Sequence, residues 1–261
     1  MKAVETFLRV EHKYPLTAAQ AVQFMELAGK YLRPDIYPEY ELHNIYYDTE
    51  ANEIAVHCLN KPEYKEKLRL RSYGDPEPGT TVYLEIKKKF REDGAKRRIP
   101  MTEKQASDYI EYGKRPEADN RQIAGEIDYI VSRCDLKPKI FIAYHRKAFS
   151  GINESDVRIT FDTDIRFRTG NVSLHESGEE KYITGQDDVL MEIKVSGRYP
   201  YWLMKILSEM KLVRSSFSKY GMIYSELLRQ SEEKRASAAV LTETEYRNMM
   251  NRKEKVCLVQ F

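Results

Sequence analysis

Charged and apolar side chains alternate along several short segments of this chain. Three of them are Lys-Leu-Arg-Leu-Arg at 67–71, Leu-Glu-Ile-Lys at 84–87 and Glu-Ile-Lys at 192–194. Side chains two positions apart on a strand share a face, so each segment places charge on one face and Leu or Ile on the other. Two guanidiniums about 7 Å apart on a strand suit consecutive phosphates. The pattern predicts a binding site for a polyanion and its metal.

The same alternation gives further candidates along the chain: Glu11 and Lys13, Lys96 and Arg98, Tyr144 and Arg146, Arg158 and Asp162, and Lys219 at the start of the last expected helix. Taken singly, each segment is typical of the solvated face of an antiparallel sheet, or of charges that pair across strands. Taken together, their number favours another interpretation. If helices cover the apolar faces, the charged faces must face one another inside a closed or nearly closed sheet.

Composition restricts the class of protein. The chain carries 43 basic and 41 acidic residues, a net charge of +2, so any strong positive potential must be local. Three separated cysteines, Cys58, Cys134 and Cys257, argue against a disulfide framework and against a cysteine metal site. No apolar run reaches the length of a membrane span, about 18 residues, and the N-terminus lacks the apolar core of a signal peptide. We therefore expect a cytoplasmic protein.

The elements expected from periodicity give an α+β fold. Strands are expected over 7–14, 43–47, 65–73, 81–90, 96–99, 139–149, 157–168 and 189–195. Helices are expected over 17–31, 102–112, from 120, 199–211 and 218–230, the first two with capping boxes at Thr17 and Thr102. Residues 50–59 read as a short helix or an extended segment, and 170–188 as a turn or hairpin. No linker divides residues 1–230, and 231–261 read as a polar tail.

Eight motifs, in this order, resemble a known family: Arg-x-Glu-x-Lys-Tyr at 9–14, Tyr-Tyr-Asp-Thr at 46–49, Lys-Leu-Arg-Leu-Arg at 67–71, Leu-Glu-Ile-Lys at 84–87, Tyr-x-Arg-x-Ala-Phe at 144–149, Arg-Ile-Thr-x-Asp at 158–162, Met-Glu-Ile-Lys at 191–194 and Ser-Lys-Tyr at 218–220. The set is similar to the VTC domain, the polyphosphate polymerase branch of the CYTH-like triphosphate tunnel metalloenzymes. The resemblance covers 7–228.

The resemblance implies an antiparallel tunnel of eight strands with helices outside. It implies transfer of the ATP γ-phosphate to a growing polyphosphate chain, release of ADP, and Mn²⁺ or Mg²⁺ as cofactor. The implied phosphate ligands are Lys13, Arg69, Arg71, Lys87, Arg146, Arg158 and Lys219, with Tyr144 as a supporting donor. Glu192 would hold the metal, with Glu11 and Glu85 as further candidates. Lys67, Lys89, Arg98 and Lys194 are expected to be cofactor-binding residues.

Two features bear on the activity. Many tunnel enzymes begin with Glu-x-Glu-x-Lys, whereas Arg9 replaces the first Glu here, as in the polymerase branch, which favours polymerisation over hydrolysis. Eukaryotic members of the branch sit in membrane-associated assemblies, so a membrane partner is a further expectation.

Two alternatives stay open: a metal-dependent hydrolase of inorganic or nucleoside triphosphates on the same fold, and a non-catalytic polyphosphate-binding module. A specific nucleic-acid ligand is not expected, because aromatic residues are not interleaved on the strand faces of Arg69 and Arg71, as a stacking platform requires.

Overall fold

We describe the fold on a computed structural model of the chain, which covers residues 10–74, 77, 79–91, 93–115, 121–175 and 178–230. The compact unit that carries the sheet ends at Tyr220 and is treated by itself. Arg9, Cys257 and the tail predicted over 231–261 lie outside the described residues. None of the helices in the described ranges has the length and apolar character needed to cross a membrane.

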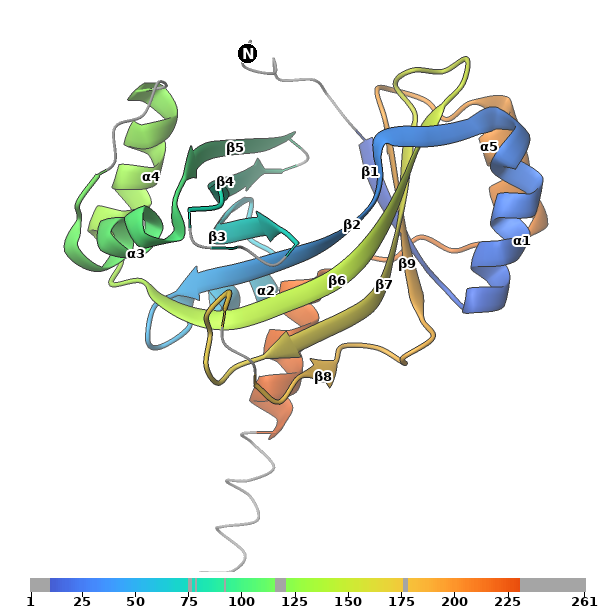
Figure 1. Cartoon of the computed structure of the whole chain (residues 1–261). Coiled ribbons are helices and arrows are strands. Elements are labelled where there is room, and N and C mark those ends of the chain that lie inside the picture. Colours follow the sequence, from blue (N-terminus) through green and yellow to red (C-terminus); the bar gives the residue numbers. More distant parts are fainter. Residues whose placement is uncertain are drawn as a thin grey trace, which may run out of the picture. The chain divides into compact units, whose positions relative to one another are not determined.

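One antiparallel sheet of nine strands organises this unit (Figure 1). The strands are β1 (Val10–Leu16), β2 (Leu32–Asp48), β3 (Tyr64–Tyr73), β4 (Val82–Phe90), β5 (Asp93–Met101), β6 (Lys137–Gly151), β7 (Arg158–Arg168), β8 (Lys181–Tyr182) and β9 (Val189–Val195). Their order is β1-β9-β7-β6-β2-β3-β4-β5, with β8 paired to β7. Eight strands therefore lie on one path, as predicted, and the two-residue β8 adds a ninth within the segment expected to turn. Within the described residues, the path of strands ends at β1 on one side and at β5 on the other, and beyond β1 a single antiparallel bridge joins Lys13 to Ser215.

The strand β2 is much longer than the segment 43–47 that alternation predicts. It begins at Leu32 and pairs with β6 along most of its length, with an irregular register between Pro34 and Glu39. Proline has no amide hydrogen to donate to a strand ladder, so Pro34 and Pro38 argue against a strand when the sequence is read alone. This half of β2 therefore lacks the regular alternation that predicts a strand. The expected 96–99 strand is also longer, because β5 starts at Asp93.

The helices are α1 (Ala18–Ala28), α2 (Glu53–Leu59), α3 (Glu103–Tyr112), α4 (Arg121–Arg133) and α5 (Tyr201–Glu209), with the short 3-10 turn η1 (Gly29–Tyr31); residues 219–230 are also helical. Both predicted capping boxes are present: Thr17 accepts from the amide of Gln20, and Thr102 from that of Gln105. Each box satisfies two of the amide hydrogens that the first turn of a helix leaves without a partner. The segment 50–59 contains a helix rather than a strand.

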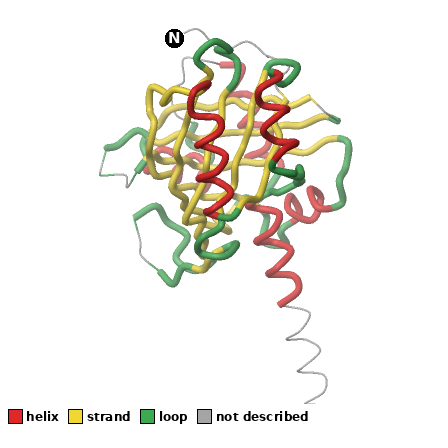
Figure 2. Tube along the Cα trace, turned by 90° about the vertical axis from the view of Figure 1, so that its right-hand side faces the viewer, coloured by secondary structure: helices red, strands yellow, loops and turns green. Residues whose placement is uncertain are grey.

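Two hydrophobic clusters lie between the sheet and its helices. In one, Phe24 of α1 and Leu203 of α5 pack with Ile193 of β9, and α1 and α5 lie over the strands in Figure 2. In the other, Tyr109 of α3 and Ile127 of α4 pack with strand residues such as Leu68 and Leu84. These apolar strand residues alternate with the charged ones, so the helices cover one face of the sheet and leave the charges on the other.

Candidate functional site

Strand register places the predicted charges on a single face of the sheet. Arg69 is directly opposite Glu85, which is opposite Arg98; Lys67 is opposite Lys87, which is opposite Lys96. On the other half of the sheet, Glu192 lies between Lys13 and Thr160, and Lys194 lies between Glu11 and Arg158. Directly paired residues point to the same side of an antiparallel sheet. We call this side the charged face.

Glu85 is the centre of a first cluster on β3, β4 and β5. Its carboxylate is 1% exposed and lies 2.7 Å from Nη2 of Arg69 and 2.8 Å from Nζ of Lys96. Nε of Arg71 is 3.6 Å away, and Nη1 of Arg98 is 4.0 Å away. Burial by itself raises the pKa of Glu85, but the neighbouring cations, Arg69 first, outweigh burial and hold that pKa far below its usual range. Glu85 is thus an ionised carboxylate shared among four cations.

Asp162 is the centre of a second cluster. It has no exposed surface and accepts two hydrogen bonds from Arg146, at 2.6 and 2.7 Å, in a bidentate pair. Nζ of Lys219 donates to the same carboxylate at 2.5 Å. Burial raises the pKa of Asp162, but Lys219 and Arg146 lower it by more, so the net shift is downward. The two cations therefore keep a fully buried carboxylate ionised.

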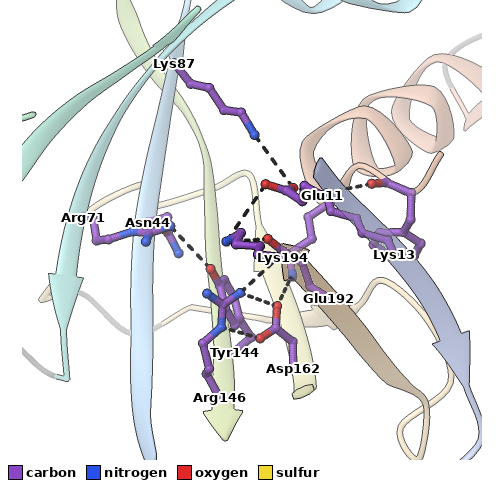
Figure 3. A network of polar contacts seen from close by, with 12 residues as sticks. Glu11, Lys13, Asn44, Arg71, Lys87, Tyr144, Arg146, Asp162, Glu192 and Lys194 are labelled. Atoms are coloured by element: carbon purple, nitrogen blue, oxygen red, sulfur yellow. Dashed lines mark hydrogen bonds and ion pairs between the residues drawn. The ribbon is translucent and has the colours of Figure 1, made fainter. Parts of the chain in front are cut away.

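Glu192 and Glu11 extend the second cluster towards β1 (Figure 3). Glu192 lies 2.6 Å from Nζ of Lys194 and 3.8 Å from Arg146. Burial opposes its charge, yet Lys194, Arg146 and Lys13 hold the pKa of Glu192 well below its ordinary value. Glu11 lies 3.5 Å from Lys13, 4.0 Å from Lys194 and 3.9 Å from Lys87.

The contact between Glu11 and Lys87 joins strands from opposite ends of the sheet. Glu11 is on β1, at one end of the strand order, whereas Lys87 is on β4, next to the other end. An ion pair between them requires the sheet to curl until its two ends lie within reach of a side-chain contact.

Lys87 and Lys96 are the half-exposed lysines of the charged face. Water reaches 51% of the Lys87 side chain and 42% of the Lys96 side chain. Desolvation by the surrounding protein nevertheless lowers the pKa of both, and, together with the charge of Arg71, it lowers the pKa of Lys96 to about 7.

Residues 215–220, which we call the strap, contact the charged face from outside the sheet. The amide of Ser215 donates to the carbonyl of Lys13 at 2.8 Å, and Nζ of Lys67 donates to the hydroxyl of Ser218 at 3.5 Å. Tyr220 donates to Asp48 at 2.6 Å, and Lys219 reaches Asp162 as described above. The strap therefore touches β1, β2, β3 and β7.

Asp48 is the buried anchor of the strap. Its carboxylate also accepts from the amides of Ile54 and Ala55, so it caps the start of α2 while it holds Tyr220. The Tyr-Tyr-Asp-Thr and Ser-Lys-Tyr motifs are therefore in contact, although they are far apart in the sequence.

The structure brings together most residues predicted for the site and leaves a few at its edge. The two clusters and the strap contain Glu11, Lys13, Arg69, Arg71, Glu85, Lys87, Arg146, Glu192, Lys194, Lys67 and Lys219; Tyr144 joins them through a 3.5 Å contact from Arg71. Arg158 is more peripheral, since it pairs with Asp35 at 2.8 Å and is 38% exposed. Arg98 is 46% exposed, and Lys89 extends the same face along β4.

Sequence reasoning missed several residues of the charged face. Asn44 accepts from Nε of Arg71 at 2.9 Å, and the hydroxyl of Tyr46 accepts from Arg69 at 3.0 Å. Asn44, Tyr46 and the motif residue Asp48 are two positions apart on β2, and this alternation of polar side chains is the sequence signal that predicts a shared face. Lys96 and Asp162 were recognised as alternating charges without a role.

The expectation that aromatic residues are not interleaved on the strand faces of Arg69 and Arg71 is wrong. Tyr46 is opposite Arg69, and Tyr83 is opposite both Arg71 and Pro100. The guanidinium of Arg98 lies 4.3 Å from the centre of the Tyr83 ring. Register, which sequence alone does not give, determines which side chains of different strands become neighbours.

A cavity of about 830 Å³ lies on the opposite face, lined by Glu41, His43, Ala143, His145, Thr163, Asp164, Arg166, Leu174, His175 and Glu180. None of the predicted site residues lines it. Its position follows from alternation, since Glu41 and His43 point away from Asn44.

The described residues contain no group of three or more His, Cys, Asp or Glu side chains arranged to hold a metal. Their donor chemistry nevertheless fits a hard cation that substrate phosphates also bind. Glu11 and Glu192 already share one cation, the ammonium of Lys194, at 4.0 and 2.6 Å. Mg²⁺ in phosphate-transfer sites takes one or two carboxylates, with phosphate oxygens as its other ligands.

A family model described as the VTC domain matches residues 8–228. The chain belongs to the VTC domain family. The match confirms the resemblance drawn from the eight motifs, and its limits agree closely with the predicted range of 7–228. The charged face described above is thus the charged face of a VTC domain.

Two curated relatives of this VTC domain are named vacuolar transporter chaperone complex subunit 4. The protein from Schizosaccharomyces pombe is 28% identical over 144 residues, which cover 47% of this chain and 20% of the relative. The protein from Trypanosoma cruzi is 26% identical over 217 residues, which cover 68% of this chain and 27% of the relative. The chain therefore spans only a limited part of the length of these relatives.

Solved structures share the fold at low identity. One is a Bacillus halodurans protein whose structure is described under the name adenylate cyclase. It superposes with a TM-score of 0.51 at 11% identity, and the match covers 82% of this chain and 96% of the other. A Hippeastrum protein, whose structure is described with a dominant triphosphatase activity, superposes with a TM-score of 0.52 at 15% identity, covering 84% and 96%. These likenesses concern the fold.

Proposed function

We propose that this VTC domain is an ATP-dependent polyphosphate polymerase. The observation that carries the proposal is the charged face, on which Lys and Arg side chains from seven strands and the strap converge around four carboxylates. Cations outnumber anions there, so the face suits a ligand with many negative charges. Membership of the VTC domain family gives that ligand its proposed identity: ATP and inorganic polyphosphate.

The reaction needs little covalent chemistry from the protein. A terminal oxygen of the acceptor polyphosphate forms a bond to the γ-phosphorus of ATP, and the bond between that phosphorus and the β,γ-bridging oxygen breaks. The electron pair leaves with ADP, so no proton has to be transferred. Positioning and charge neutralisation supply most of the rate in such transfers.

The residues proposed for this work are those of the two clusters. Arg69, Arg71 and Arg146 would grip pairs of phosphate oxygens, because their planar guanidiniums match that geometry. Lys13, Lys87 and Lys219 would act as point charges, with Tyr144 as a neutral donor and Arg158 at the edge. Lys67, Lys89, Arg98 and Lys194 would add positive potential along the same face.

We also propose that the sheet closes into a tunnel around this face. The contact of Glu11 on β1 with Lys87 on β4 supports closure, because it spans the gap between the two ends of the strand order. The strap adds a second connection, since it contacts Lys13 on β1 and Lys67 on β3.

Glu192, with Glu11, would hold the divalent cation, Mn²⁺ or Mg²⁺, that the family uses. When bound by these carboxylates, such an ion would supply positive charge that offsets the charge of the substrate phosphates. Glu85 is a weaker candidate for this role, because four cations of the protein already surround its carboxylate.

The domain boundary and the partners are proposals as well. We place the functional unit in residues 1–230, which include the strap and the helix that follows it. Because the two curated relatives are named as subunits of a vacuolar transporter chaperone complex, we propose that this domain also works with a membrane partner.

Product analysis tests the activity. Purified protein is incubated with ATP and Mn²⁺, and the products are resolved by electrophoresis. Long polyphosphate together with ADP is the expected result. Free phosphate without chains would indicate a triphosphatase instead, and retained polyphosphate binding without turnover would indicate a binding module.

The variant Arg69→Ala tests the site. Loss of one preorganised donor commonly lowers turnover by about 100-fold or more, so we expect a loss of that size. Arg97→Ala is the matched control, because Arg97 points to the other face of β5 and pairs with Glu126. Equal activity of Arg69→Ala and wild type would refute the site assignment, provided that both proteins unfold at similar temperatures.

A further inference from the structure

Three tyrosines form a cluster at one end of the charged face. The rings of Tyr40 and Tyr73 have centroids 5.6 Å apart, and those of Tyr73 and Tyr83 are 5.8 Å apart and nearly perpendicular. Arg98 completes the cluster: its guanidinium lies over the Tyr83 ring at 4.3 Å, and its Nη1 donates to the Tyr73 hydroxyl at 3.3 Å. The cluster thus contains aromatic faces and one planar cation.

Proposed phosphate ligands are the immediate neighbours of this cluster. Tyr83 is directly opposite Arg71, and Tyr40 is directly opposite Arg146. Tyr73 follows Arg71 by two residues on β3, about 7 Å along the same face. A ligand whose phosphates lie on Arg71 and Arg146 would therefore reach the tyrosines with the group attached to those phosphates.

The cluster is accessible to a ligand, and on β3 it lies far from the point where the strap contacts Lys67. Tyr73 is 43% exposed, and Tyr40 and Tyr83 are half-buried. The strap contacts Lys67, six residues from Tyr73 on β3, or roughly 20 Å along the strand. Along β3, the strap contact and the tyrosine cluster thus occupy opposite ends of the strand.

We propose that Tyr73, Tyr83 and Arg98 form the binding site for the base of a nucleoside triphosphate. The inference rests on the proposed function, in which ATP is the phosphate donor. A bare polyphosphate has no group that an aromatic ring could stack on, whereas every nucleobase has a flat π face. Aromatic rings and arginine planes are the surfaces on which proteins stack bases.

The site takes the base by stacking rather than by reading its edge. Stacking tolerates any base, so the site accepts ATP and GTP alike. The donor nucleotide is then held at the aromatic end with its triphosphate directed along the charged face towards the second cluster. The acceptor chain, which needs only cations, occupies the remainder of that face.

Comparison of two ligands separates base binding from phosphate binding. Affinities for a non-hydrolysable ATP analogue and for inorganic triphosphate are measured by calorimetry for wild type and for Tyr83→Leu. We expect the variant to bind the ATP analogue about 10-fold more weakly, while its affinity for inorganic triphosphate stays unchanged. Tyr83→Phe keeps the ring and should keep wild-type affinity for both.

Tyr129→Leu is the matched control. Tyr129 is an exposed tyrosine on α4 that also lies beneath an arginine, with Arg133 5.0 Å from its ring centre, but it is outside the charged face. Its loss should change neither affinity. If Tyr83→Leu does not fold, as judged by its unfolding temperature, the more exposed Tyr73→Leu provides the same test.

The outcomes distinguish this inference from the proposed function. Equal weakening of both ligands in Tyr83→Leu, or no weakening of either, would overturn the base site even in a protein that makes polyphosphate. Selective weakening of the ATP analogue in a protein that makes no polyphosphate would support the base site and reject the polymerase.

Discussion

At the scale of single residues, Asp162 shows how this fold holds charge away from water. Its carboxylate has no exposed surface and is ionised because Arg146 and Lys219 contact it. A buried charge is tolerated only when it is paired and hydrogen-bonded, so the carboxylate and the cations depend on one another. The carboxylates Glu85 and Glu192 stand in the same relation to their neighbours. Each fixes the position of cations that a phosphate could contact.

Lys96 gives a prediction about protons. Burial and the charge of Arg71 lower its pKa to about 7, so Lys96 loses its proton at a much lower pH than an ordinary lysine does. An anionic ligand nearby favours the charged form and raises this pKa. Binding of inorganic triphosphate at pH 8 should therefore take up to about one proton from solution through this group. Calorimetry in two buffers of different ionisation enthalpy measures the uptake.

The variant Lys96→Gln should remove that part of the proton uptake. Lys88→Gln is the control, because Lys88 points to the opposite face of β4 and pairs with Glu126 at 2.9 Å. If Lys96→Gln takes up as many protons as wild type, Lys96 does not titrate near neutral pH.

Residue patterns predict which face a charge lies on but not which charges meet. Alternation predicts that Arg69 and Glu85 lie on the face opposite to Leu68 and Leu84, because those leucines must face the hydrophobic core. It could not show that Arg69, Arg71, Lys96 and Arg98 share one carboxylate, since that depends on the register of three strands. The alternation of Asn44, Tyr46 and Asp48 is a weaker signal than alternating charges, because neutral polar side chains also occur on solvated strand faces.

At the scale of elements, the strap determines where Lys219 can lie. The hydrogen bond from Tyr220 to the buried Asp48 fixes one end of it, and the backbone bond between Ser215 and Lys13 fixes the other. Tyr220 also stacks on Tyr46, with ring centroids 4.8 Å apart. Lys219 is therefore held between two anchored positions.

The variant Tyr220→Phe should loosen this hold. Loss of a hydrogen bond to a charged group costs about 2 kcal/mol of unfolding free energy, which denaturant titration measures. Polymerase turnover should fall as well, because Lys219 loses its fixed position. In a Lys219→Ala background the same change should leave turnover unaltered, and this non-additivity is the signature of an effect that acts through Lys219.

Tyr199→Phe is the control for that prediction. The Tyr199 hydroxyl contacts Nδ1 of His12 at 2.6 Å, outside the charged face, so its loss should affect stability without affecting turnover. Additive effects of Tyr220→Phe and Lys219→Ala on turnover would contradict the positioning role of the strap.

Elements with regular alternation and clear caps could be predicted from sequence. β3, β4, β9, α1 and α3 follow the predicted ranges closely, because their side chains alternate or their first residues form capping boxes. The first half of β2 could not be predicted, because Pro34 and Pro38 interrupt the alternation of polar and apolar residues. Pairing with β6 holds this part of the strand instead. That pairing joins segments about one hundred residues apart, which no local pattern reveals.

At the scale of the whole sheet unit, the cations of the charged face repel one another when no polyanion is bound. Many cations from different strands converge on one concave surface, and four carboxylates neutralise only part of their charge. A bound polyanion should therefore stabilise the fold as well as occupy the site. Strand order and curvature produce this convergence, and neither could be predicted from the strand patterns alone.

Inorganic triphosphate should raise the unfolding temperature. A ligand at 100 times its dissociation constant adds about 2.7 kcal/mol, which corresponds to roughly 5–10 °C for a domain of this size. Differential scanning calorimetry measures the shift. Sodium chloride at matched ionic strength is the control, and an equal shift with the salt would mean that screening alone, without a binding site, accounts for the effect.

The carboxylates of the charged face have one more consequence, which concerns movement along a polymer. If the proposed function is correct, a guanidinium or ammonium that releases a phosphate would have a carboxylate of the protein to return to: Glu85 for Arg69, Asp162 for Arg146, Glu192 for Lys194. A chain of identical phosphates could then advance by exchange of partners, one unit at a time, without leaving a desolvated charge alone at any step. The barrier to sliding would be low and nearly the same at every position, as processive growth of a long polymer requires.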